Sequence, residues 1–276
     1  MDALTKLISL ALFEDSGLGD LTSESLLEPG LPGQGIIVAK EPLIVAGIDA
    51  AVKVFKMVDP NAETESLFKD GDSVSKGDII FKVKGDLISM LKGERVALNF
   101  LQRLSGIASF TRSFVEKLGN VNVRLCDTRK TVPGLRVIEK AAVRAGGAYN
   151  HRMSLYDGIL IKDNHIAVAN GVKHAVETVK ARVSHLMKIE VETSTIKEVK
   201  EAVDAGADVI MLDNMSIPLM KQAVEYINGR AVVEASGNVT FENITKIAKT
   251  GVDVISSGSL THQARAVDMS MRIYRL

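Results

Sequence analysis

Basic side chains gather in one stretch of the chain, between Asp127 and His165. The stretch holds nine Lys, Arg and His residues against four Asp and Glu, whereas the whole chain balances 34 Lys and Arg against 34 Asp and Glu. A local positive excess in a neutral chain predicts a small anionic ligand, because Arg holds a carboxylate or phosphate through two hydrogen bonds and Lys adds a point charge. The nine are Arg129, Lys130, Arg136, Lys140, Arg144, His151, Arg152, Lys162 and His165.

These basic residues divide into two groups by position. Arg136, Lys140 and Arg144 recur every four residues, a spacing typical of a solvated helix face, and this interpretation is favoured for them. Arg129 and Lys130 instead follow an apolar run directly and precede a Pro-Gly turn. They are therefore expected at the end of a strand, facing a ligand.

His151, Arg152 and Lys162 join Arg129 and Lys130 if the strand at 158–162 neighbours the strand at 123–127. A single histidine often has only a structural role. For His151 the structural and the substrate-binding interpretations carry equal weight at this point.

Two carboxylates form a second candidate group. Glu192 closes the run KIEVE, and Asp213 follows DVIML. Carboxylates at strand ends can bind Mg²⁺, accept hydrogen bonds from sugar hydroxyls or stabilise developing positive charge. Ion pairs with Arg129 or Lys162 are the structural alternative. Glu190 alternates with Glu192, but only Glu192 ends the run, so Glu192 is the predicted site residue.

Small-residue turns follow the last two apolar runs, at Ser236-Gly237-Asn238 and at Ser257-Gly258-Ser259. Glycine lets the backbone approach a ligand closely, and N–H groups at the start of a following helix can hold a phosphate. In α/β barrels the loops after the final strands are frequent phosphate sites. The two turns therefore predict a phosphate pocket.

The elements that must position these residues alternate between short apolar runs and helical stretches. Such alternation predicts parallel strands in βα units. Six successive runs end in a polar or charged residue, which favours a barrel mouth over the single ligand-binding crevice of an open sheet. Because fewer than eight units are visible, an incomplete barrel of six or seven strands is expected. The runs lie at 123–127, 158–162, 188–192, 208–212, 231–235 and 253–256.

The N-terminal part has a different pattern. Short β-branched runs between Gly33 and Asp86 are separated by Gly and Pro turns, and residues 91–118 have helical periodicity. We predict an α/β protein with an N-terminal α+β sandwich domain at 1–102 and a catalytic α/β barrel at 103–265. The C-terminal tail at 266–276 is expected to pack back on the first domain.

Composition excludes several classes of protein. Zero net charge removes the global electrostatic argument for nucleic acid or an anionic membrane. Cys126 is the single cysteine, so no intrachain disulfide can form, and a reducing compartment is indicated. No apolar run approaches the roughly 20 residues of a membrane helix. A cytoplasmic enzyme acting on small molecules is expected.

Eight motifs together resemble the quinolinate phosphoribosyltransferase family over essentially the whole chain. The resemblance implies conversion of quinolinate and phosphoribosyl pyrophosphate to nicotinate mononucleotide, CO₂ and pyrophosphate, with Mg²⁺. The motifs are GDLTS (19–23), ERVALN (94–99), DTRKTVPGLR (127–136), NHRMSLYDGILIKDNH (150–165), KIEVE (188–192), VIMLDN (209–214), EASGN (234–238) and SSGSLTH (256–262).

The resemblance also implies roles for individual residues. The quinolinate carboxylates are held by Arg129, His151, Arg152 and Lys162, and Lys130 reaches towards the donor. Glu192 and Asp213 contact the ribose hydroxyls and the metal, and with Lys130 they are the implied catalytic residues. Arg95 comes from the neighbouring subunit of a homodimer. The remaining substrate-binding residues are Thr128, Ser236, Gly237, Asn238, Ser257, Gly258, Ser259 and His262.

Other functions stay open from the residues alone. A ModD-type paralogue associated with molybdenum transport keeps the TRKT stretch and takes a different anionic acceptor, but it tends to lack Lys162 and Asn164. A barrel aldolase would use Lys162 as a Schiff-base amine. A non-enzymatic binding module is disfavoured, because three polar groups converge on one mouth.

Overall fold

The computed structural model describes residues 2–276 and divides them into two compact units. The first unit contains residues 2–112, Thr131–Gly147 and Leu260–Leu276, and the second contains Ser113–Lys130 and Ala148–Ser259. Each unit is described by itself.

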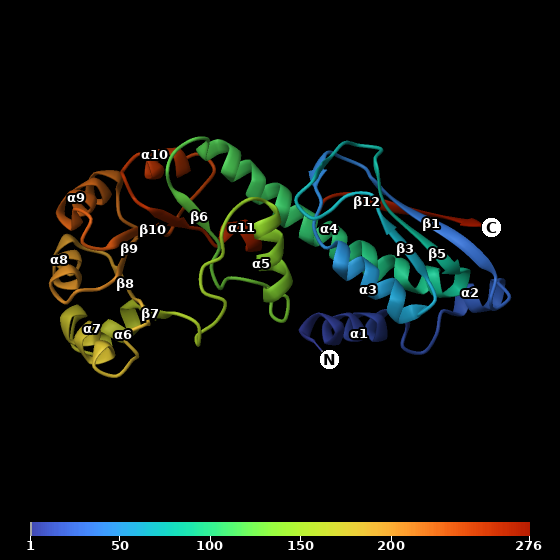
Figure 1. Cartoon of the computed structure of the whole chain (residues 1–276), viewed down its shortest axis with the longest axis horizontal. Coiled ribbons are helices and arrows are strands. Elements are labelled where there is room, and N and C mark those ends of the chain that lie inside the picture. Colours follow the sequence, from blue (N-terminus) through green and yellow to red (C-terminus); the bar gives the residue numbers. More distant parts are fainter. Residues whose placement is uncertain (1) are drawn as a thin grey trace. The chain divides into compact units, whose positions relative to one another are not determined.

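An antiparallel sheet is the frame of the first unit, with strand order β12-β1-β5-β3 (Figure 1). The C-terminal strand β12 pairs with β1 along its whole length, from Gly33 opposite Arg275 to Ala39 opposite Met269. The strands are β1 (Pro32–Ala39), β3 (Glu63–Ser66), β5 (Ile79–Asp86) and β12 (Met269–Arg275), and a second small sheet joins β2 (Leu43–Ile44) to β4 (Ser73–Val74).

Helices bury their apolar faces against this sheet. Phe55 from α3 stacks on Phe81 from β5 with ring centroids 5.8 Å apart, and Leu98 and Leu101 of α4 belong to the same buried cluster. Asp2 caps α1 by accepting the Thr5 N–H at 2.8 Å. The helices are α1 (Ala3–Ser16), α2 (Leu21–Leu26), α3 (Ile48–Val58), α4 (Leu87–Leu118) and α5 (Arg136–Ala145).

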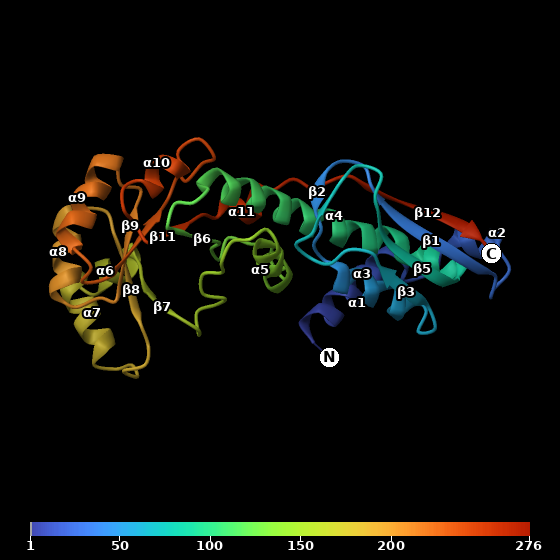
Figure 2. The ribbon, with the colours of Figure 1, turned by 45° about the horizontal axis from the view of Figure 1, so that its top comes forward.

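Six parallel strands form the second unit, in the order β6-β11-β10-β9-β8-β7. Helices α7, α8 and α9 lie along one side of the strands (Figure 2). The strands are β6 (Arg124–Cys126), β7 (Ile159–Ile161), β8 (Ile189–Thr193), β9 (Val209–Asp213), β10 (Val232–Ser236) and β11 (Val254–Ser256). The helices are α6 (Asp163–Val168), α7 (Val172–Lys180), α8 (Ile196–Asp204), α9 (Ile217–Ile227), α10 (Ile244–Ala248) and α11 (Ser259–His262), whose last residues belong to the first unit.

The predicted fold class is confirmed: six parallel strands alternate with helices, and an antiparallel sheet precedes them. Every predicted run of the second part overlaps an observed strand, and the ends differ by one residue at most. Within residues 2–276, no helix combines the length and apolarity needed to cross a membrane.

The predicted solvated face of the helix at Arg136, Lys140 and Arg144 is wrong for Lys140. Lys140 is fully buried and Arg136 is half-buried, with its Nε donating to Thr131 Oγ1 at 3.1 Å; only Arg144 is exposed. The cause is that α5 packs inside the first unit. Its fully buried Glu139 is paired with Arg103 of α4 at 2.8 Å.

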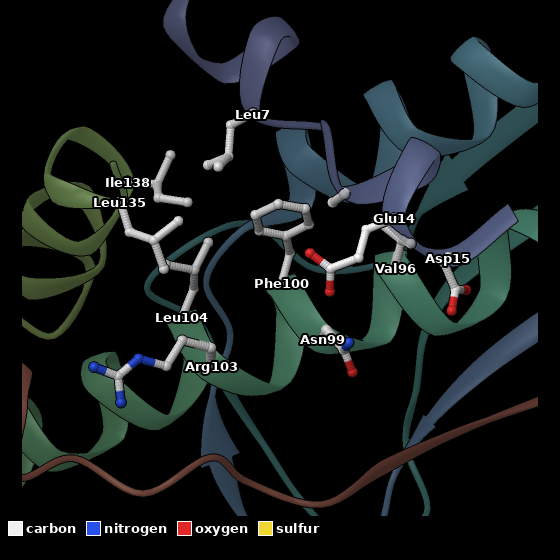
Figure 3. A pocket seen from close by; sticks show the side chains of 11 residues that line it. Leu7, Glu14, Asp15, Val96, Asn99, Phe100, Arg103, Leu104, Leu135 and Ile138 are labelled. Carbon is white, nitrogen blue, oxygen red and sulfur yellow. The ribbon is translucent and has the colours of Figure 1, made fainter. Parts of the chain in front are cut away.

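A pocket of about 260 Å³ lies in the first unit between α1, α4 and α5 (Figure 3). Its wall is mostly apolar, and Phe100 and Leu104 of α4 face Leu7 of α1 and Ile138 of α5. Glu14, Asp15, Asn99 and Arg103 supply its polar groups. None of the predicted site residues lines this pocket. Most of them lie instead at the strand ends of the second unit.

Candidate active site

Parallel strands bring the predicted residues of the second unit to one edge of the sheet. The carboxyl ends of such strands are where α/β folds build their ligand sites. Lys162 follows β7, and Glu192 is the last residue but one of β8. Asp213 and Ser236 are the last residues of β9 and β10. Arg95 and His262 belong to the first unit, and both are exposed there.

Asp127 ties the loop before β7 to strand β6. It is fully buried, its Oδ1 accepts the His151 N–H at 2.9 Å, and its Oδ2 accepts Asn150 Nδ2 at 2.6 Å. Tyr149 completes the link by donating its N–H to Leu125 O at 2.8 Å. Asp127 is not among the predicted site residues, although its place at the end of the first apolar run was a usable signal.

The condition for grouping His151, Arg152 and Lys162 with Arg129 and Lys130, that strands 123–127 and 158–162 are neighbours, is not met as a strand pairing. Strands β6 and β7 lie at the two edges of the six-stranded ladder. The segment before β7 makes the contact instead, through the bridge between Cys126 and Tyr149. An incomplete barrel leaves two strand edges, and this loop joins one of them.

His151 lies against two buried glutamates that the sequence analysis missed. Its Nε2 is 3.1 Å from Glu190 Oε2 and 3.6 Å from Glu234 Oε2. Burial alone would lower the pKa of His151, but the hydrogen bonds to Glu190 and Glu234 outweigh burial and raise the pKa to about 10. Burial in turn raises the pKa of Glu190. The two-residue period of β8, which puts Glu190 on the face of Glu192, was the signal that could have identified Glu190.

Arg152 and Arg129 bring two positive charges together. Burial, and after it the charge of Arg129, lowers the pKa of the Arg152 guanidinium. The Arg152 side chain is half-buried, and its Nη1 donates to Gly158 O at 2.7 Å. Neighbouring like charges repel unless an anion lies between them, so this pair favours an anionic ligand.

Lys162 and Glu192 form an ion pair across neighbouring strands. The Lys162 Nζ lies 3.1 Å from Glu192 Oε2, and Lys162 is exposed whereas Glu192 is half-buried. The structural alternative weighed for Glu192 is thus present. An ion pair at the open edge of a sheet can also exchange for contacts with a charged ligand.

Asp213 belongs to a network of short polar side chains. Its Oδ2 accepts Asn214 Nδ2 at 2.7 Å, and Asn214 Oδ1 accepts Asn238 Nδ2 at 2.8 Å. Gly237 lies beside this network with φ +82°, and a Cβ there would meet Asn214 Oδ1 at 2.2 Å. The turn after β10 therefore requires glycine.

The serines after β10 and β11 also contact one another. Ser256 Oγ donates to Ser236 Oγ at 3.0 Å, and the hydroxyls of Ser257 and Ser259 lie 2.7 Å apart. After β6, Thr128 Oγ1 accepts the Lys130 N–H at 3.0 Å. Thr128, Lys130 and the two serine turns thus lie in loops that follow the carboxyl ends of β6, β10 and β11.

Comparisons with known proteins agree over both units. Residues 20–105 match the N-terminal domain, and residues 107–272 the C-terminal domain, of quinolinate phosphoribosyl transferase. The probable nicotinate-nucleotide pyrophosphorylase [carboxylating] of Bacillus subtilis (strain 168) is 44% identical, covering 98% of this chain and 93% of the relative. A mitochondrial quinolinate phosphoribosyltransferase [decarboxylating] of Nicotiana tabacum, 2b, is also 44% identical, covering 98% and 82%. The solved nicotinate-nucleotide pyrophosphorylase of Francisella tularensis superposes with a TM-score of 0.94 at 39% identity, covering 99% and 96%.

Proposed function

The chain belongs to the quinolinate phosphoribosyltransferase family, and from this premise we propose which residues bind the acceptor and which bind the donor. The chain transfers the phosphoribosyl group of phosphoribosyl pyrophosphate to quinolinate with decarboxylation. The products are nicotinate mononucleotide, pyrophosphate and CO₂, a step of NAD biosynthesis.

The acceptor subsite consists of Arg129, His151, Arg152 and Lys162. The observation that carries this assignment is that Arg129 and the half-buried Arg152 place two positive charges near each other, where they could hold a dicarboxylate such as quinolinate. Their two guanidinium groups would hold the carboxylates and orient the pyridine nitrogen towards the ribose. Lys130, exposed on the same loop as Arg129, would reach the donor.

The donor subsite consists of the groups after β8 to β11. Departure of pyrophosphate leaves positive charge on the ribose, which the carboxylates of Glu192 and Asp213 would stabilise. The small-residue turns after β10 and β11 offer backbone N–H groups and hydroxyls to phosphate oxygens. Loss of CO₂ then uses the positively charged ring nitrogen as the electron sink. The phosphate-contacting residues would be Thr128, Ser236, Gly237, Asn238, Ser257, Gly258, Ser259 and His262.

Glu192 and Asp213 fit a magnesium ion. Both are half-buried carboxylates at the ends of neighbouring strands, and Mg²⁺ prefers oxygen ligands from one or two carboxylates together with substrate phosphates. When bound, Mg²⁺ would neutralise the charge of the departing pyrophosphate. Lys162 would hold Glu192 in place through its ion pair.

A homodimer completes the site in this proposal. Arg95 is exposed on α4 in the first unit, so it is free to contribute to the acceptor subsite of a partner chain. A cytoplasmic location is supported by the single, buried Cys126, which suits a reducing compartment.

The alternative chemistries have less support. A Schiff-base lysine needs a free amine facing the carbonyl substrate, whereas the Lys162 Nζ is paired with Glu192 Oε2 at 3.1 Å. A ModD-type acceptor is disfavoured because the relatives named above are called quinolinate or nicotinate-nucleotide enzymes.

The test is incubation with quinolinate, phosphoribosyl pyrophosphate and Mg²⁺, with nicotinate mononucleotide measured by chromatography and CO₂ from carboxyl-labelled quinolinate. Product from the unaltered chain, and none from Lys162→Ala, is the expected result. Lack of product at high enzyme concentration would refute the function. Borohydride trapping of a carbonyl substrate on Lys162 would support the aldolase instead.

A further inference from the structure

Two buried glutamates converge on the ring of His151 from strands that are not neighbours. Glu190 comes from β8 and Glu234 from β10, with β9 between them in the ladder. Their Oε2 atoms lie 3.1 Å and 3.6 Å from His151 Nε2. The exposed fractions of Glu190 and Glu234 are only 8% and 3%.

Stability of the fold does not explain these glutamates. The second oxygen of each carboxylate, Oε1, is buried without a hydrogen-bond partner. A buried carboxylate with an unsatisfied oxygen destabilises a fold relative to an apolar side chain of similar size. Neighbouring positions of the same strands, Val191 and Ala235, are apolar and fully buried, as expected for barrel strands. Ion-pair networks retained at such a cost are candidates for a functional role.

The other side of the His151 ring is also occupied by the protein. Its Nδ1 accepts the Arg152 N–H at 2.8 Å. The two carboxylates favour a protonated ring, whereas the Arg152 N–H needs the lone pair on Nδ1; both arrangements keep a proton on Nε2, facing Glu190 and Glu234. The ring therefore connects the two strands to the backbone of Arg152.

We propose that Glu190 and Glu234 are positioning residues for acceptor binding. They hold the Nε2 proton of His151 and thereby fix the turn from His151 to Arg152, which presents the Arg152 guanidinium to a carboxylate of the acceptor. Asp127 holds the same turn from the side of β6, through the His151 N–H. This inference rests on the proposed function of the acceptor subsite.

The kinetic test replaces each glutamate by Leu, which removes the acceptor oxygens, and by Gln, whose carbonyl oxygen can still accept the Nε2 proton. For Glu190→Leu and Glu234→Leu, the KM for quinolinate should rise about tenfold to a hundredfold, while the KM for phosphoribosyl pyrophosphate changes less than about twofold. The Gln variants should recover part of the loss. An unchanged quinolinate KM in both Leu variants would overturn the proposal.

Thr193→Val is the matched control for damage to the strand. Thr193 is buried on β8 and donates its hydroxyl to Met211 O at 2.9 Å. Thr193 lies three positions after Glu190 on β8, so the two side chains point to opposite faces of the sheet and Thr193 faces away from the His151 ring. An equal rise in the quinolinate KM for Thr193→Val would show a general packing effect and overturn the positioning role.

A second measurement does not depend on any reaction. Nitrogen-15 NMR of histidine-labelled protein, with the His151 signals assigned by their loss in His151→Gln, should show a fixed proton on Nε2. In the double variant Glu190→Leu with Glu234→Leu, that proton should exchange faster with water, because its acceptor oxygens are gone. Unchanged His151 signals would refute the hydrogen bonds, whereas absence of product from the unaltered chain would refute the proposed function alone.

The competing explanation for the close approach of His151, Glu190 and Glu234 is that their side chains bind a divalent cation. It would displace the Nε2 proton. Elemental analysis of the purified chain that finds one equivalent of a transition metal, lost in Glu234→Leu, would overturn the proposal in favour of a metal site.

Discussion

Arg129 and Arg152 show at the scale of single residues how the site is prepared for its ligand. Burial lowers the pKa of Arg152, and the charge of Arg129 lowers it further. In the proposed acceptor subsite, a bound dicarboxylate would reduce the repulsion between these two charges, and this would contribute to its binding free energy.

The first prediction tests whether geometry or charge matters at Arg152. Arg152→Lys keeps the charge but loses the planar two-pronged hydrogen bonding, so the KM for quinolinate should rise by about tenfold or more. Steady-state kinetics at saturating phosphoribosyl pyrophosphate measures the change. Arg230→Lys is the control, since Arg230 donates to carbonyls at the end of α9 and lies over the Tyr226 ring, outside the proposed subsites. A quinolinate KM for Arg152→Lys equal to that of the control would rule out carboxylate binding by Arg152.

A second prediction concerns Gly237, where a Cβ would meet Asn214 Oδ1 at 2.2 Å. Gly237→Ala should displace Asn214 and raise the KM for phosphoribosyl pyrophosphate, with the KM for quinolinate little changed. Gly229→Ala is matched for backbone strain, because Gly229 has φ +74° but nothing within 4 Å of its Cβ position. Both variants should lose about 1 kcal/mol of unfolding free energy, and only Gly237→Ala should alter kinetics. Equal KM values for phosphoribosyl pyrophosphate in the two variants would show that the turn after β10 does not belong to the donor subsite.

Residues that end strands could be predicted from the sequence, whereas the partners of residues inside strands could not. A polar residue after an apolar run indicates a strand end directly, which is how Lys162, Glu192 and Asp213 were selected. Glu190 and Glu234 lie within the runs, where their partner is a histidine from a distant segment. The contact depends on which strands lie opposite each other, and spacing along the chain does not contain that information.

At the scale of elements, α5 shows how a charge pattern can mislead. Its basic residues recur at the spacing of an exposed face, yet Glu139 and Lys140 are fully buried. The partner that permits burial of Glu139 is Arg103, 36 residues earlier on α4, and its Nε and Nη2 both donate to Glu139 Oε1. The Oε2 of Glu139 accepts the Val132 N–H at 3.2 Å, so this ion pair also fixes the loop before α5.

A third prediction follows for this ion pair. Glu139→Ala leaves Arg103 without its buried partner and should lower the free energy of unfolding by about 3 kcal/mol. Glu201→Ala, which removes a surface partner of Lys197 at 3.8 Å, should lower it by less than about 0.5 kcal/mol. Urea denaturation followed by circular dichroism measures both. Similar small losses in the two variants would show that the buried pair contributes no more than a surface pair.

At the scale of the whole molecule, the proposed acceptor subsite of one chain needs Arg95 of a partner chain. The acceptor subsite lies in the second unit, whereas Arg95 and His262 belong to the first. Both family domains are matched in sequence, at 20–105 and 107–272. The resemblance assigns Arg95 to the neighbouring subunit, so the homodimer is the level at which this proposal is tested.

The last prediction uses two chains that are each defective in a different part of the site. Arg95→Ala and Lys162→Ala should each be inactive alone, because every site in either dimer lacks one side chain. After exchange of subunits in an equal mixture, half of the dimers are mixed and each has one intact site, so about a quarter of the unaltered activity should return. Mixing Arg95→Ala with the double variant Arg95→Ala, Lys162→Ala is the control, because no intact site can then form. Differently tagged chains that co-purify without recovering activity would show that Arg95 does not act across a dimer.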